Sequence, residues 1–260
     1  MRMPARPSRQ QWAIHSRDEH IKALSLAAAA LFVLPHIPFG NYVLYPFMIL
    51  TTWFHEMGHG MSALLVGFHF ERLVLFPDGS GFAETYLPVD ASGVRQALVS
   101  AGGPLMPAVI GSGLILASAR PQLWRPALYA LGAAIGLSTL LYVRSMIGWA
   151  ILPAIAIGIV WIAARGSPWL ERFALQFLGL AASLSMFQQW DYLLMERAVV
   201  GGQEILSDTG AIEQNLFLPH WVWAIGIVVL AAGMIGSSLV YALSDKRFAR
   251  RWDTGFGGRR

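Results

Sequence analysis

Long apolar runs separated by short polar segments dominate this sequence, and their lengths predict most of its fold. The apolar runs lie at about residues 22–34, 42–68, 94–118, 126–142, 147–164, 173–194 and 221–243. A membrane-spanning helix needs about 20 apolar residues, and most of these runs approach or exceed that length. The pattern therefore predicts an all-α polytopic membrane protein with about six transmembrane helices.

Two of the runs are irregular. The first is short and stops at Pro35, and the third is interrupted by "AGGP" at residues 101–104 and by Pro107. Because proline lacks the backbone donor that a helix interior needs, we expect the third run to form a broken helix. Basic residues at both ends of the chain favour an even number of spans, hence six rather than seven.

One segment has a strand-like pattern instead. From Phe70 the sequence reads "FERLVLFPDGSGFAETYLP", with short β-like pieces on either side of the turn at Pro77, Asp78 and Gly79. We expect a short β-hairpin here, near the membrane surface and next to the preceding apolar helix.

Composition supports a membrane protein and sets the domain boundaries. Hydrophobic residues make up 55% of the 260, and charged residues make up 13%, about half of what an average soluble domain contains. No Asp or Glu occurs in residues 91–170. We expect a loosely ordered basic leader at residues 1–21, one membrane-embedded domain at residues 22–243 and a basic tail at residues 244–260.

The net charge of +4 comes largely from the two ends of the chain. The basic residues there are Arg2, Arg6, Arg9, Arg17, Lys246, Arg247, Arg250, Arg251, Arg259 and Arg260. Such clusters beside apolar spans are typical of cytoplasmic anchoring, so both termini are predicted to be cytoplasmic and no nucleic-acid partner is expected.

A candidate metal site lies in the second apolar run, where His55, Glu56 and His59 follow the order H-E-x-x-H. Residues i and i+4 share one helix face, so the two imidazoles can converge on one Zn²⁺ while Glu56 acts as general base. A chance match is the alternative, but ionisable groups within an apolar span are functional by default. The chain has no cysteine, so a metal here must use histidines and carboxylates.

A catalytic zinc site needs a third protein ligand. Among the downstream acids, Asp191 alone sits well inside an apolar helical run, with Gln188 one turn before it to hydrogen-bond a carboxylate or a substrate backbone. Asp208 is the main alternative, although a helix cap would also explain it. His69 and His220 are weaker candidates.

With these residues in place, the sequence resembles the site-2 protease class of membrane metallopeptidases, the M50 family, and within it the compact bacterial M50B-like branch. The resemblance covers residues 42–243 and rests on "HEMGH", "LLVGFHFERLVLFPDGSG", "AGGPLMPA", "QWDYLL" and "SDTGAIEQNLFLP". It implies zinc held by two histidines and an aspartate, a location in a bacterial cytoplasmic membrane, and cleavage of a peptide bond in or near a substrate's transmembrane helix. The "LDG" motif that usually supplies the aspartate is absent, and "WDY" at residues 190–192 is the nearest substitute.

The expected function is therefore intramembrane zinc proteolysis, with His55, His59 and Asp191 as ligands and Glu56 as the base that moves a proton from water to the leaving amine. The expected partners are a membrane protein or peptide substrate and the lipid bilayer. The strand-like residues Leu73 and Phe76 would pair with unwound substrate, and the broken helix would line a water-filled cavity. Two alternatives stay open: a transporter or channel with a metal- or proton-binding cluster, and an inactive scaffold of the same fold.

Overall fold

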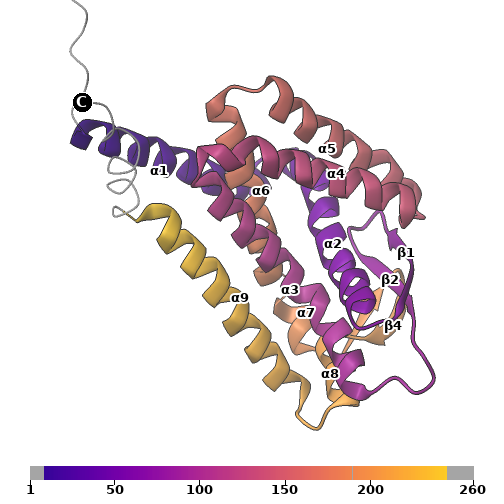
Figure 1. Cartoon of the computed structure of the whole chain (residues 1–260). Helices are drawn as coiled ribbons and strands as arrows, with labels where there is room; N and C mark the ends of the chain where they lie inside the picture. The colour runs from indigo at the N-terminus through magenta and orange to yellow at the C-terminus, as the bar shows by residue number, and fades with distance from the viewer. Residues whose placement is uncertain (1–8, 189, 245–260) are drawn as a thin grey trace, which may run out of the picture.

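A computed structural model describes residues 9–188 and 190–244, and in this part of the chain the fold is mostly helical with two small antiparallel sheets (Figure 1). The helices are α1 (Arg9–Val33), α2 (Gly40–Leu65), α3 (Gly93–Ser118), α4 (Trp124–Leu141), α5 (Met146–Arg165), α6 (Pro168–Gln188), α7 (Trp190–Leu194), α8 (Asp208–Asn215) and α9 (His220–Leu243). The strands are β1 (His69–Leu75), β2 (Gly81–Tyr86), β3 (Arg197–Val200) and β4 (Gln203–Leu206).

Part of the predicted leader and nearly all of the predicted tail lie outside the described residues. Residues 1–8 and 245–260 lie outside them, together with the basic cluster of the tail. Residues 9–21 belong to α1, so this part of the predicted leader is helical and continuous with the first apolar run.

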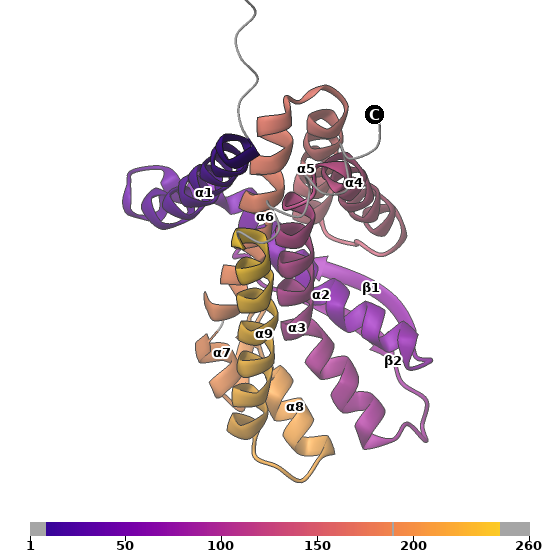
Figure 2. The same ribbon diagram turned by 60° about the vertical axis from the view of Figure 1, so that its left-hand side comes forward.

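Helix α3 is the centre of the arrangement. It packs against α2, α6, α8 and α9, while α4 and α5 form an antiparallel hairpin, as their short connection predicts. Figures 1 and 2 show α9 running along α3, the α4–α5 hairpin at one end of the molecule and α8 at the other. The elements at the α8 end surround the candidate metal residues.

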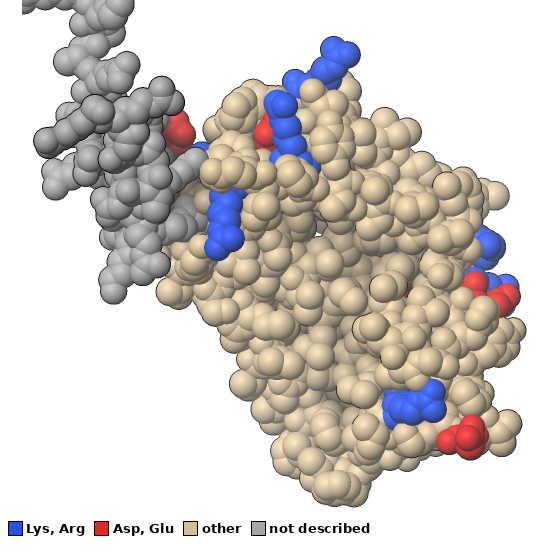
Figure 3. All heavy atoms as spheres, viewed as in Figure 1, with Lys and Arg blue, Asp and Glu red and all other residues tan. Residues whose placement is uncertain are grey.

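In the part of the chain that the structure describes, three helices are long and apolar enough to cross a membrane: α3, α5 and α9. Residues 18–36 and α2 pass the same test only as a pair, bent by 118° at the break between them, which gives four spans at most in the described chain. The six predicted spans are therefore not confirmed. Helix α6 contains the ion-pairing residues Glu171 and Arg172, and α4 contains Arg125, the partner of Glu171, so charged residues make both helices less apolar. Figure 3 shows a face with few charged side chains.

The predicted break in the third run is wrong, because α3 is one continuous helix with Pro104 and Pro107 inside it. Neighbouring helices in membrane proteins can satisfy the backbone groups that a proline frees. Here α2 approaches very closely: a Cβ on Gly102 would lie 2.0 Å from Ser62 Oγ, and a Cβ on Gly58 would lie 2.3 Å from the Gly102 carbonyl oxygen. The glycines of "AGGP" therefore serve the contact between α2 and α3 rather than a helix break.

The predicted β-hairpin is present as β1 and β2, with an irregularity in register between Phe70 and Arg72. The other edge of β1 is also occupied. The Leu73 N–H donates to the Tyr142 carbonyl at 2.9 Å, and the Arg144 N–H donates to the Leu73 carbonyl at 2.9 Å. This ties the hairpin to the α4–α5 connection and fixes its position over α2.

The second hairpin, β3–β4, was not predicted. Its turn consists of Gly201 and Gly202, both with positive φ (57° and 80°), between the strand sequences "RAVV" and "QEIL". A Gly-Gly pair between two β-prone segments is a hairpin signal. This signal was present in the sequence, but residues 200–217 are largely polar and no strand was predicted there.

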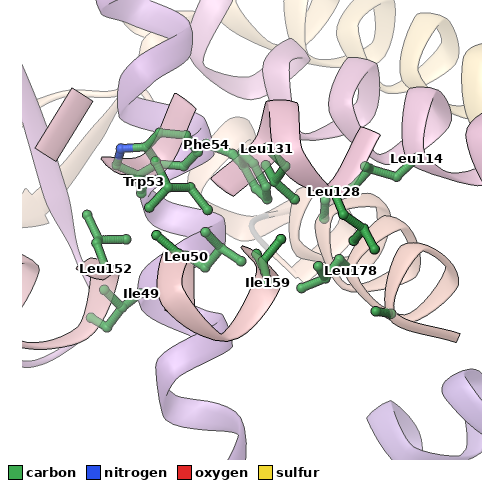
Figure 4. Close-up of a cluster of buried hydrophobic side chains, with 14 of the residues drawn as sticks. Ile49, Leu50, Trp53, Phe54, Leu114, Leu128, Leu131, Leu152, Ile159 and Leu178 are labelled. Carbon is green, nitrogen blue, oxygen red and sulfur yellow. The ribbon is translucent and has the colours of Figure 1, made fainter. Parts of the chain in front are cut away.

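A hydrophobic cluster fixes the rotation of α2. Figure 4 shows the α2 residues Ile49, Leu50, Trp53 and Phe54 packed against side chains of the neighbouring helices, and all four are at least 96% buried. Those side chains come from α3, α4, α5 and α6: Leu114, Leu128, Leu131, Leu152, Ile159 and Leu178. Each helical residue is turned by about 100° from its neighbour, so His55, directly after Phe54, faces away from this cluster.

Candidate metal centre

His55, His59 and Asp208 come together in a compact group. The Nε2 atom of His55 lies 3.0 Å from Asp208 Oδ2, and the Nε2 atom of His59 lies 3.2 Å from Asp208 Oδ1. The two Nε2 atoms are 3.2 Å apart, and all three ligand atoms lie within 4.8 Å of one another. His55 and Asp208 are buried and His59 is half-buried, so the group is largely shielded from solvent.

The two histidines are presented by consecutive turns of α2, as the i, i+4 spacing predicts. Asp208 is the first residue of α8, but it is not the cap of that helix. Ser207 is the N-cap, and its Oγ accepts a hydrogen bond from the Gly210 N–H at 3.0 Å. The Asp208 carboxylate is therefore free of the capping role and points to the histidines instead.

Asp191, the first choice for the third ligand, lies outside the group, and the carboxylate that joins the two histidines is that of Asp208, the alternative. The expected apolar run does not continue as one helix: α6 ends at Gln188, and Asp191 lies in the short helix α7 with its side chain exposed and outside the group. Asp191 stands in the first turn of this five-residue helix. The side chain of Gln188 lies outside the described part of the structure.

The two weaker histidine candidates have other partners. His69 Nε2 lies 3.1 Å from Glu71 Oε2, and His220 Nδ1 lies 2.7 Å from Glu213 Oε2. Neither belongs to the group.

The chemistry of the group fits a zinc ion. His59 Nδ1 lies 2.8 Å from the Val99 carbonyl oxygen, which can only accept, so Nδ1 carries the proton and Nε2 keeps its lone pair. Asp208 Oδ2 is buried and accepts no well-aligned hydrogen bond, despite the nearness of His55. Two imidazoles and one carboxylate leave an open fourth position, which is the ligand set of catalytic zinc.

The charge of Asp208 agrees with this arrangement. Burial by itself raises the pKa of Asp208, but the charge interactions with the neighbouring His59 and His55 imidazoles outweigh it, and the net pKa lies below its ordinary value. Asp208 is therefore a carboxylate at neutral pH.

The "AGGP" segment forms one wall of the group. A Cβ on Gly103 would lie 2.1 Å from His59 Nε2 and 2.8 Å from His55 Nε2. No side chain fits in this space, so glycine at this position lets α3 pass directly against the two histidines. The segment was expected to line a water-filled cavity as part of a broken helix; it lies instead in a continuous helix against the two histidines, and residues outside it line the cavity beside Glu56.

Glu56 lies between the group and a cavity of about 200 Å³. The cavity is lined by Thr52, His55, Glu56, Gly79, Ser80, Gly81, Tyr192, Val199 and Val200. Glu56 is buried, and its carboxylate accepts a hydrogen bond from the Ala83 backbone N–H of β2. Leu73 and Ala83 face each other in the hairpin, but the backbone groups of Leu73 bond to the α4–α5 connection and not to Ala83. In such a pair both residues direct their backbone groups outwards, so the Ala83 N–H points away from β1 and towards Glu56.

The predicted substrate-binding pair does not present a free strand edge. Leu73 is completely buried and its backbone bonds to the α4–α5 connection. The Phe76 N–H donates to the Ser80 carbonyl at 2.8 Å, and its ring is so close to the β3–β4 turn that a Cβ on Gly201 would lie 2.5 Å from it. Among the described residues, no strand pairs with the second edge of β2.

Sequence reasoning missed Tyr192, which contacts the group from α7. Its ring lies edge-on to the His55 imidazole, with centroids 6.3 Å apart at 76°. Burial raises the pKa of Tyr192, and the Asp208 and Glu56 carboxylates raise it further, so the phenol stays protonated at neutral pH. The only signal in the sequence was its place beside Asp191 in "WDY".

The chain matches a known protein family. The model of the family described as Peptidase M50B-like matches residues 23–238. Searches of curated proteins and of solved structures gave no match.

Proposed function

The chain belongs to the Peptidase M50B-like family and is an integral membrane protein, and from this premise we propose that it is a zinc protease that hydrolyses peptide bonds in or near transmembrane segments of membrane proteins. The observation that supports this proposal is the convergence of His55, His59 and Asp208 beside the carboxylate of Glu56. We also propose a bacterial cytoplasmic membrane location with both termini in the cytoplasm, because basic residues gather at both ends of the chain.

Each residue has a defined task in the proposed reaction. His55, His59 and Asp208 hold the ion, which when bound supplies the Lewis acidity that activates water and polarises the scissile carbonyl. Glu56 takes a proton from the attacking water and delivers it to the leaving amine. The Ala83 N–H keeps the Glu56 carboxylate directed to the cavity.

In this proposal, substrate binds along β2. In the described chain β2 pairs only with β1, so its second edge has no strand partner, and Ala83 brings this edge next to Glu56. An extended substrate segment that adds to this edge would bring a peptide bond to the base. A transmembrane helix must unwind locally to bind in this way.

The decisive experiment is Glu56→Gln in the purified, zinc-loaded protein. We expect cleavage of a single-span test substrate in proteoliposomes to fall by about 10²- to 10⁴-fold, because the general base is lost, while the zinc content stays at the wild-type level. Fragments would be identified by mass spectrometry. Glu204→Gln, on an exposed side chain of β4, is the matched control and should cleave like the wild type.

Undiminished cleavage by Glu56→Gln would refute the assignment of the base. Zinc transport by a wild type that cleaves none of a panel of transmembrane substrates would favour the transporter instead.

A further inference from the structure

Tyr192 touches two of the three residues of the metal group. Its ring packs edge-on against the His55 imidazole, and its hydroxyl interacts with both the carboxylate and the backbone N–H of Asp208. His55 comes from α2 and Asp208 from α8, so one side chain of α7 connects the two elements that supply the group.

The two histidines differ in how their rings are held. His59 is anchored through Nδ1 by the Val99 carbonyl at 2.8 Å, which is the usual way in which a metal-binding histidine is oriented. His55 Nδ1 is buried and has no hydrogen-bond partner. The orientation of the His55 ring must therefore come from packing, and the Tyr192 ring supplies a contact on its edge.

Helix α7 is fastened to the start of α8 by the residues on either side of Asp208. The Thr209 hydroxyl donates to the Leu193 carbonyl at 2.6 Å, and the Ser207 hydroxyl donates to the Met195 carbonyl at 2.5 Å. Leu193, next to Tyr192, is almost completely buried. Tyr192 and Asp208 therefore belong to one connected unit.

The other hydroxyl groups that line the cavity have partners elsewhere. The Thr52 hydroxyl donates to the Gly79 carbonyl at 2.6 Å, and the Ser80 hydroxyl donates to Asp78 Oδ1 at 2.7 Å. Among the hydroxyl side chains lining the cavity, only that of Tyr192 has a described contact with the metal group.

We propose that Tyr192 is a positioning residue of the metal centre, whose ring fixes the His55 imidazole and whose hydroxyl holds the Asp208 carboxylate towards the two histidines. The inference rests on the proposed function, in that His55, His59 and Asp208 bind zinc. Partners of this kind orient the ligands, and their loss weakens metal binding by about 10- to 100-fold.

The test uses two variants that separate the hydroxyl from the ring. Tyr192→Phe keeps the ring and removes the hydroxyl, and Tyr192→Leu removes the aromatic edge as well. Zinc affinity of the purified protein in detergent is measured by competition with a chromophoric chelator. We expect the dissociation constant to rise by about 10- to 100-fold in Tyr192→Phe and further in Tyr192→Leu.

A second readout reports the geometry directly. The visible absorption bands of the Co²⁺-substituted protein depend on ligand geometry, and we expect them to shift in Tyr192→Phe. The matched control is Tyr45→Phe, which also removes a hydroxyl hydrogen bond, to the Pro77 carbonyl at 2.7 Å, but lies outside the metal group. It should leave both the zinc affinity and the Co²⁺ spectrum unchanged.

Wild-type zinc affinity and an unchanged Co²⁺ spectrum in Tyr192→Phe would overturn this inference. If that result came with a lower kcat at unchanged KM, the hydroxyl would act on the substrate rather than on the ligands. A wild type that binds no zinc would overturn the proposed function together with this inference, so the two failures are distinguishable.

Discussion

The metal group draws its residues from two regions that are built differently. Helix α2 is 26 residues long and supplies His55 and His59 from neighbouring turns of a regular, largely buried element. The region from α7 to α8 supplies Asp208, and each of its helices and strands has eight residues or fewer. One region is fixed by helix geometry and the other by specific hydrogen bonds.

The difference shows which interactions determine the position of each residue of the metal group. Packing of Ile49, Leu50, Trp53 and Phe54 sets the rotation of α2, so the two histidines follow from local spacing. The place of Asp208 depends on buried hydroxyl groups that bind carbonyls of α7 and of the residue after it. The second region should therefore be the more sensitive to loss of single polar contacts.

The largest expected effect concerns the identity of the aspartate. Asp208→Ala should abolish zinc binding, because two histidines alone leave the ligand set incomplete. Asp191→Ala should retain the full wild-type zinc content, because its side chain is exposed and outside the group. Elemental analysis of the purified proteins measures both. Loss of zinc in Asp191→Ala with retention in Asp208→Ala would reverse this assignment.

The second largest effect, on stability and zinc binding, is expected where α3 contacts the two histidines. Gly103→Ala would place a Cβ 2.1 Å from His59 Nε2, so we expect destabilisation by about 1–3 kcal/mol and weaker zinc binding. Gly113→Ala lies in the same helix and meets nothing within 4 Å, so it should be neutral or stabilise by about 0.5–1 kcal/mol. Thermal unfolding in detergent measures both changes. Equal behaviour of the two variants would contradict the close approach of α3.

The smallest effect tests the hydrogen bonds of the second region. Ser207→Ala removes the cap of α8 and the bond to the Met195 carbonyl, and we expect a loss of about 1 kcal/mol in stability with a several-fold weaker zinc affinity. Ser237→Ala is the control, because its hydroxyl bonds to the Met234 carbonyl on an exposed part of α9. Wild-type zinc affinity in Ser207→Ala would show that the start of α8 does not depend on these contacts.

Helix α2 and the first hairpin could be predicted from the sequence, because the residues that determine each of them are close together in the chain. The H-E-x-x-H spacing needs only a helix to bring His55 and His59 to one face, and the Pro77–Asp78–Gly79 turn needs only its flanking strands to form a hairpin. The number of spans was harder to predict, because hydropathy alone does not show that α1 and α2 meet at a sharp bend.

By itself the sequence determined the apolar helices, the first hairpin and the placement of the two histidines and Glu56 on one helix, since each follows from periodicity over a few neighbouring residues. Only the tertiary structure decided that Asp208 rather than Asp191 joins the group, that α3 stays continuous against Gly58, and that Tyr192 reaches His55. These outcomes depend on how distant segments pack. A carboxylate inside an apolar stretch resembles a buried ligand in sequence, but contacts between α2, α3, α7 and α8 determine which carboxylate faces the histidines.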